Sequence, residues 1–412
     1  MLEQLGMNAK KAADVLTSAT TQQKNEALVN IGRALMDNKD TIINCNRIDL
    51  ENGRKAGLNE GLLDRLMLND ERIEAIAKGC IDVSQLEDPC GRIVDETVRP
   101  NGLVIKKVTC PMGVIGIIYE ARPNVTADAA ALCLKSGSAV ILRGGKEAIE
   151  SNKAIVKIMR NAVNQAGLPM DSIQLVEDTS RASATELMKM KGSLDCLIPR
   201  GGKALIQAVV ENSTVPVIET GSGNCHIYVD EYANINMAAQ IIFNAKTQRI
   251  SVCNSCESLV IHSKIIDKAL PKIKKQLDKK NVIIRGDARA KAVCPEIDAA
   301  DESDFSTEYL DYIISVKTVD SLDEAIMHIN KNSTGHSESI ITDNEENAKI
   351  FMQRVDSSSV YHNASTRFTD GAEFGLGAEI GISTQKLHAR GPMGLAQLTT
   401  TKYLIFGNGQ IR

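Results

Sequence analysis

The chain has 412 residues, of which 43% are hydrophobic and 24% charged, as is ordinary for a globular protein with two or three packed units. The formal net charge of −4 argues against a nucleic-acid-binding surface, for which a basic excess is expected. No apolar run reaches the roughly 18 residues needed to cross a membrane, so we expect no membrane span.

The amino-terminal segment and the cysteines indicate a cytoplasmic protein. Residues 1–19 mix charged and apolar positions as an amphipathic helix does, and they lack the apolar core of a signal peptide. The 10 cysteines are too sparse for a disulfide framework. Cys253 and Cys256 have CxxC-like spacing, but no second ligand pair follows them, so we expect no metal site.

The first half of the chain predicts helices followed by an alternating pattern. Residues 1–90 show helical periodicity, and a turn signal at 99–102 precedes a predicted strand at 103–109. Beyond it, helices are predicted at 126–135 and 147–166, and strands at 114–119, 139–142, 173–176, 194–198 and 215–218. Such alternation is typical of a parallel sheet with helices on its faces.

A second α/β stretch follows. We predict a helix over 320–330, capped by Asp320, and strands at 258–261, 312–316, 339–342, 359–361 and 399–405. Residues 363–394 are glycine-rich and aperiodic, which indicates long loops of the kind that are usually functional. The sequence therefore predicts an α/β protein with two domains and a small strand element.

The residues best able to carry chemistry surround Cys253. Lys246 and Arg249 precede it, and cationic neighbours favour the nucleophilic thiolate and bind anions. The alternative is that Cys253 is a small buried hydrophobic residue, as most cysteines are. The polar loop around it weakens that alternative without removing it.

Two glycine-rich segments can bring backbone close to a ligand. Residues 219–223 follow an apolar strand, and the Gly201–Gly202 pair after Pro199 opens a helix whose amides can cradle a pyrophosphate. Neither segment matches the G-x-G-x-x-G fingerprint, and both can equally be plain turns.

Taken together, a series of motifs resembles the aldehyde dehydrogenase superfamily over nearly the whole chain. The motifs are YEARPNVT (119–126), LRGGKE (142–147), IPRGG (198–202), NAKTQRISVCN (244–254), NSTGHSE (332–338), EFGLGAEIG (373–381) and HARGPMGL (388–395). The resemblance implies two Rossmann-like parallel-sheet domains plus a small β flap for oligomerisation. The implied ranges are 1–97 and 113–222 for the NADP-binding domain, 223–394 for the catalytic domain, and 98–112 and 395–412 for the flap.

The resemblance also implies roles for single residues. Cys253 matches the nucleophile, the Asn124 amide matches an oxyanion-hole donor, and Glu219 matches the general base of aldehyde-oxidising members. Arg143 stands where many relatives bind the adenosine ribose, and Glu308 matches the glutamate that holds the nicotinamide ribose. The implied cofactor-binding set is Arg143, Gly144, Lys146, Pro199, Gly201, Gly202, Glu219 and Glu308.

One departure from the family pattern bears on the cofactor. The usual Lys-Pro-Ser-Glu is replaced by Arg143-Gly144-Gly145-Lys146. A cation thus replaces the acidic residue that would oppose a 2′-phosphate, which favours NADPH over NADH.

Within the superfamily, the motifs are most similar to the branch that reduces L-glutamyl 5-phosphate to L-glutamate 5-semialdehyde through a cysteine thioester. That resemblance implies a homo-oligomer and a transient hand-over of substrate from glutamate 5-kinase. Candidate ligands of the substrate phosphate are Arg122, Lys246 and Arg249, and candidates for its amino-acid end are Ser365 and Arg367.

Two rival interpretations share part of the pattern. An enzyme that oxidises an aldehyde to an acid or acyl-CoA would share Cys253 and Asn124, but it would be expected to show the Lys-Pro-Ser-Glu segment. A non-catalytic member would be expected to lack the nucleophile or the asparagine, and both are present.

Overall fold

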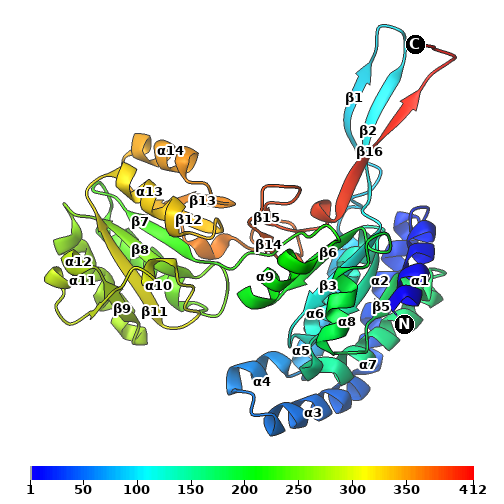
Figure 1. Ribbon diagram of the computed structural model, residues 1–412, viewed down its shortest axis with the longest axis horizontal. Helices are drawn as coiled ribbons and strands as arrows, with labels where there is room; N and C mark the ends of the chain where they lie inside the picture. The colour runs from blue at the N-terminus through cyan, green and yellow to red at the C-terminus, as the bar shows by residue number, and fades with distance from the viewer. Residues whose placement is uncertain (1) are drawn as a thin grey trace. The chain divides into compact units, whose positions relative to one another are not determined.

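A computed structural model describes residues 2–412, and the chain divides into two compact units (Figure 1). Of the described residues, unit 1 contains 2–220, 375–381 and 393–412, and unit 2 contains 221–374 and 382–392. Each unit is built around a parallel sheet, and a small antiparallel sheet accompanies unit 1. The predicted fold class is therefore confirmed.

Unit 1 begins with amphipathic helices, as the apolar periodicity predicts. They are α1 (Leu2–Leu16), α2 (Thr21–Asp37), α3 (Lys39–Lys55), α4 (Glu60–Leu66) and α5 (Asp70–Gln85). The start of α2 is fixed by a capping box between Thr20 and Gln23. The apolar stripe of that helix, which includes Leu28, Ile31 and Leu35, is buried.

The parallel sheet of unit 1 has the strand order β5-β4-β3-β6. Its strands are β3 (Val114–Tyr119), β4 (Ala139–Arg143), β5 (Ile173–Leu175) and β6 (Cys196–Arg200), and its helices are α6 (Pro123–Lys135), α7 (Ile149–Gln165), α8 (Arg181–Met188) and α9 (Lys203–Asn212). Because parallel strands end at the same edge, the segments after β3, β4 and β6 emerge together, as Ile118 pairing with Arg143 and Tyr119 with Arg200 shows. The predicted cofactor residues Arg143, Gly144, Lys146, Pro199, Gly201 and Gly202 lie at the ends of β4 and β6 or just after them, whereas Glu219 and Glu308 lie elsewhere.

The strand predicted at 215–218 is wrong. That segment makes only an isolated bridge between Leu197 and Val217. The Pro216 carbonyl accepts from the Leu197 N–H. Regular pairing stops there because Pro216 has no N–H to donate to a strand ladder.

A three-stranded antiparallel sheet of order β1-β2-β16 also belongs to unit 1. It contains β1 (Ile93–Val98), β2 (Val104–Pro111) and β16 (Thr399–Phe406). Pairing of β16 with β2 runs from Thr399–Pro111 to Phe406–Val104. The sheet leaves several large apolar side chains exposed, namely Ile93, Val94, Val98, Tyr403, Leu404, Ile405 and Phe406.

Among the described residues, unit 2 is built on a seven-stranded parallel sheet of order β10-β9-β11-β8-β7-β12-β13. The strands are β7 (Cys225–Val229), β8 (Cys256–His262), β9 (Ile283–Gly286), β10 (Asp298–Ala299), β11 (Ile313–Val319), β12 (Ser337–Ile341) and β13 (Ser359–His362). Helices α10 (Ile235–Thr247), α11 (Ile266–Leu277) and α12 (Ala288–Val293) pack with one apolar cluster. Helices α13 (Leu322–Asn332) and α14 (Glu345–Arg354) pack with the other, so the sheet is buried on both faces.

Two local predictions need comment. The cap of α13 is Ser321, whose hydroxyl accepts from the Glu324 N–H, so Asp320 was the wrong residue; its carboxylate binds Arg289 instead. Residues 363–394 are largely irregular, as predicted, apart from the 3₁₀ turn η5 (Thr366–Phe368), β14 (Ile382–Ser383) and β15 (Gly391–Pro392). None of the helices within residues 2–412 is both long enough and apolar enough to cross a bilayer.

Candidate active site

Cys253 lies half-buried in the loop between α10 and β8, where the backbone packs against Gly223. A Cβ at Gly223 would lie only 1.4 Å from the Cys253 carbonyl oxygen, so no other residue fits there. The Gly223 N–H donates to Glu308 Oε1 at 2.7 Å, and the Cys225 thiol donates to the Cys253 carbonyl at 3.1 Å. The structure therefore brings Cys253 and Glu308 together through one glycine.

Asn254 ties the cysteine loop to residues 365–369. Its side chain is buried, and its Nδ2 donates to the Thr369 carbonyl at 2.9 Å. Its own carbonyl accepts from Thr366 Oγ1 at 2.8 Å, and its Oδ1 accepts from the Arg367 guanidinium. The sequence analysis missed Asn254, for which adjacency to Cys253 was the available signal.

The Arg367 guanidinium lies near the Cys253 loop, and Arg249 lies near Arg367. Arg367 is half-buried and donates from Nε to Gln248 Oε1 at 2.9 Å, and its backbone N–H is bound by Ser365 Oγ at 3.3 Å. Burial lowers the pKa of Arg367, the nearby Arg249 lowers it further, and Cys253 acts in the opposite direction. A thiol near a guanidinium group is suited to react as a thiolate, and the guanidinium can bind a departing anion.

Lys246 lies elsewhere, in the packing of α10 against β8. Its Nζ donates to Glu257 Oε2 at 2.6 Å, and both side chains are fully buried. Burial raises the pKa of Glu257 to about 7, although Lys246 opposes the shift. We therefore assign Lys246 to holding this part of unit 2 together and leave it out of the proposed phosphate site.

Asn124 lies in the first turn of α6, and its side chain is exposed. Its Nδ2 donates to Asp128 Oδ2 at 3.0 Å, which leaves the second amide hydrogen for a ligand. Burial raises the pKa of Asp128 to about 6, while the Asn124 bond and Arg200 oppose the shift. The sequence analysis missed Asp128, although its i, i+4 spacing from Asn124 was a usable signal.

Replacing Asp128 by Asn should disturb both stability and activity. Because the pKa is raised from 3.8 to about 6, the stability contributed by this carboxyl is full at low pH and is lost as the pH rises through about 6. The free energy of unfolding of Asp128→Asn should lack that decline, and its kcat should fall about tenfold at alkaline pH because the Asn124 amide loses a charged acceptor. Denaturant titrations and pH–rate profiles measure both. Asp82→Asn, an exposed change on α5, is the control; equal profiles for the two variants would contradict the role.

The residues after β4 hold their own loop in place. Arg143 Nη2 donates to the Thr179 and Ser180 carbonyls at 2.7 and 2.9 Å. Gly144 packs so tightly that a Cβ would lie 2.2 Å from Asn152 Nδ2. Lys146 is exposed at the start of the 3₁₀ turn η1 (Lys146–Ala148). Only the Lys146 side chain therefore extends freely from this loop toward solvent.

The two glycines after β6 receive a carboxylate. The Gly202 N–H, at the N-cap of α9, donates to Glu120 Oε2 at 3.0 Å, and a Cβ on Gly201 would meet the Glu120 carboxyl at 2.7 Å. An anion thus already occupies the helix N-terminus where the sequence predicted a pyrophosphate cradle, so the donors there fit such a group. In the same region the Pro199 carbonyl accepts from Thr220 Oγ1 at 2.7 Å, beside the half-buried Glu219.

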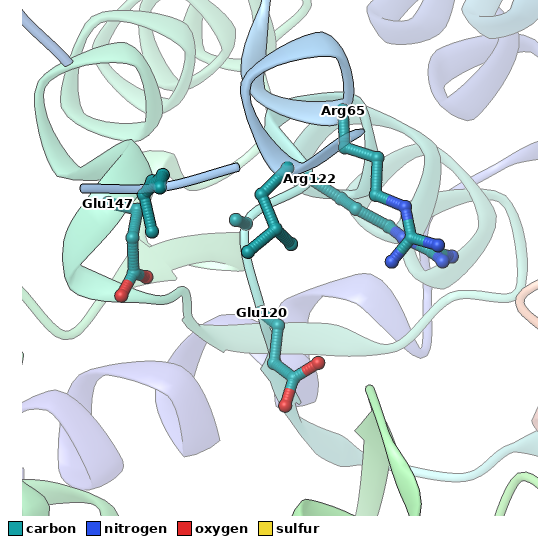
Figure 2. A pocket seen from close by; sticks show the side chains of 7 residues that line it. Arg65, Glu120, Arg122 and Glu147 are labelled. Carbon is teal, nitrogen blue, oxygen red and sulfur yellow. The ribbon is translucent and has the colours of Figure 1, made fainter. Parts of the chain in front are cut away.

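Unit 1 also contains a cavity of about 280 Å³ near the end of β3 (Figure 2). It is lined by Leu58, Leu62, Arg65, Glu120, Ala121, Arg122 and Glu147. Arg122 was predicted as a ligand of the substrate phosphate, whereas Arg65 was not predicted, because an arginine in a helical segment is most often a solvated residue.

Comparison with known proteins agrees with this fold. The chain matches the model of the aldehyde dehydrogenase family over residues 2–308 and 298–403, and it belongs to that family. A relative named γ-glutamyl phosphate reductase, from Clostridium botulinum (strain Alaska E43 / Type E3), is 58% identical over 407 residues, which cover 99% of this chain and 98% of the relative.

Solved structures extend the comparison. The crystal structure of γ-glutamyl phosphate reductase from Thermotoga maritima is 49% identical, has a TM-score of 0.98, and is matched over 100% of this chain and 99% of that one. An acetylating aldehyde dehydrogenase from Geobacillus thermoglucosidasius, at 18% identity and a TM-score of 0.70 over 100% and 97% of the two chains, shares the fold.

Proposed function

We propose that this enzyme reduces L-glutamyl 5-phosphate to L-glutamate 5-semialdehyde and phosphate with NADPH, the second step of proline biosynthesis from glutamate. The observation that carries the proposal is a half-buried thiol, Cys253, in a loop that the Arg367 guanidinium binds through the side chain of the adjacent Asn254. The substrate class is suggested by full-length relatives that are named γ-glutamyl phosphate reductase and are 55 to 58% identical.

The first chemical step uses Cys253. Its thiolate attacks the acyl carbon, a C–S bond forms, and the bond to the phosphate oxygen breaks with the electron pair leaving on phosphate. Arg249 and Arg367 neutralise the departing phosphate. The sequence analysis expected Arg367 at the amino-acid end of the substrate; its closeness to Arg249 favours the phosphate instead.

The second step needs a hydride, which bound NADPH supplies. We propose that Arg143, Lys146, the Gly201–Gly202 turn and Glu308 hold the cofactor, with Gly144, Pro199 and Glu219 shaping the backbone around it. The Asn124 amide and the Cys253 backbone N–H stabilise the oxyanion on the acyl carbon, at a few kcal/mol for each donor. Collapse releases the semialdehyde and restores the thiolate.

The test is the reverse reaction, followed as the absorbance of reduced nicotinamide. Semialdehyde and NADP⁺ should give a signal that requires inorganic phosphate, and NAD⁺ should give a weaker one. An equal signal without phosphate would replace the proposal with hydrolytic aldehyde oxidation, because water would then accept the acyl group.

Glu219→Gln should keep most of the reductase activity, within about threefold of wild type. Acyl transfer to and from phosphate needs no activated water, and a strong base near the thioester would promote its hydrolysis. Steady-state kinetics in the reverse direction measure the effect. A loss comparable to that of a Cys253 variant would show that Glu219 takes part in the chemistry.

We also propose that the enzyme is a cytoplasmic homo-oligomer, a dimer or a dimer of dimers, that receives its unstable substrate from glutamate 5-kinase. The exposed apolar residues of the β1-β2-β16 sheet, such as Val98, Ile405 and Phe406, support association through this sheet.

A further inference from the structure

The cavity near the end of β3 contains an arginine that serves no visible structural purpose. Arg65, on α4, is half-buried and, within residues 2–412, has no hydrogen bond or ion pair. By contrast, Arg72 on the next helix binds the Asp64 carboxylate at 2.7 Å. An unpaired guanidinium on the wall of a cavity is available to pair with an anionic ligand.

The same cavity is lined by carboxylates that form no ion pair with that arginine. Glu120 and Glu147 line it, yet neither lies within the 4.0 Å of Arg65 that would make an ion pair. Figure 2 shows the guanidinium groups of Arg65 and Arg122 pointing to one side, with Glu147 on the other. Leu58, Leu62 and Ala121 add an apolar part to the lining. The cavity thus offers an anion-binding side and a cation-binding side.

We propose that this cavity binds the zwitterionic α-amino-acid group of the substrate. Arg65 and Arg122 bind the α-carboxylate, and the α-ammonium faces Glu147. The inference rests on the proposed function, and it deepens it by assigning the end of the substrate that does not react. Arg122 stands two residues before Asn124, so a short alkyl chain can join a group bound there to an acyl carbon at the Asn124 amide.

Size and charge select this ligand over a dinucleotide. A volume of about 280 Å³ is at the lower limit of the roughly 300–1,000 Å³ that drug-sized ligands occupy, so it suits an amino acid. The Glu147 carboxylate on the wall would repel the phosphates of a nucleotide, whereas it attracts an ammonium group.

Binding can be tested without turnover, by calorimetry on the full chain with three probes. L-Glutamate carries both charged groups, glutarate lacks the ammonium, and 4-aminobutyrate lacks the α-carboxylate. We expect L-glutamate to bind at least tenfold more tightly than either analogue. Arg65→Leu should weaken L-glutamate at least tenfold and leave 4-aminobutyrate unchanged, because only the former has the α-carboxylate. Arg54→Leu, an exposed change at the end of α3, should alter neither.

Kinetics provide the second readout. In Arg65→Leu the KM for semialdehyde should rise at least tenfold, with kcat within threefold and the KM for NADP⁺ within twofold of wild type; Arg65→Lys should recover part of the loss. A higher KM for NADP⁺ would assign the cavity to the cofactor and overturn the proposal. Unchanged L-glutamate binding in a folded Arg65→Leu variant would also overturn it. Loss of phosphate dependence in the wild type contradicts the proposed function instead, and the calorimetry separates the two.

Discussion

Cys253→Ala should reduce kcat of the phosphate-dependent reaction by at least about 10⁴-fold, because no other group can take up the acyl chain. The half-buried thiol lies in a loop whose backbone is set by Gly223 and Asn254. Alanine leaves that backbone and the cofactor residues in place, so NADP⁺ binding should survive. Activity is measured in the reverse direction, and cofactor binding by fluorescence.

Cys256→Ala is the matched control. That thiol is three residues away in β8, fully buried, and its pKa is strongly raised by burial, so it is unreactive. The variant should keep its activity within a few-fold. Iodoacetamide should label Cys253 and spare Cys256, as peptide mass spectrometry would show. Full activity in Cys253→Ala would refute the thioester mechanism.

Lys246→Met should lower the free energy of unfolding by about 3 to 5 kcal/mol, because it strands the buried Glu257 carboxylate without its partner. Burial raises the pKa of Glu257 to about 7, so this carboxyl is neutral in acid. Its ionisation lowers the free energy of unfolding as the pH rises through that value. The loss in Lys246→Met should therefore be larger at pH 8 than at pH 6. Urea titrations at both values measure it.

The double variant Lys246→Met, Glu257→Leu removes both buried charges and should regain most of the lost stability. If Lys246 instead bound the substrate phosphate, the single variant would raise the KM for phosphate and unfold like wild type. That result would return Lys246 to the phosphate site.

Much of the fold could be predicted because buried parallel strands are continuous apolar runs. β3 was predicted at its observed bounds, since all its residues, Val114–Tyr119, are buried. β7 was missed because His226 and Tyr228 interrupt its apolar pattern. β1 was missed because its residues are all exposed. Packing against a core therefore imposes no recognisable pattern of apolar and polar residues on this strand.

The candidate site was less predictable than the fold. Residues adjacent in the chain, such as Arg249 and Cys253, could be grouped by inspection. Contacts across helices and strands could not: nothing in the sequence joins Lys246 to Glu257, or places Arg65 and Arg122 on one cavity. A sequence does not show whether a charged residue is hydrated at the surface, buried in an ion pair or placed to bind a ligand. Only the packing of the folded chain distinguishes these cases.

The β1-β2-β16 sheet has a consequence for the timing of biosynthesis. About 290 residues separate Pro111 from its partner Thr399, so β2 leaves the ribosome long before the strand that completes its pairing. At roughly 5–20 residues per second, the delay is about 15 to 60 s. Throughout that interval one edge of β2 stays unpaired. Such an edge can pair with a strand of a neighbouring nascent chain instead of with its own β16.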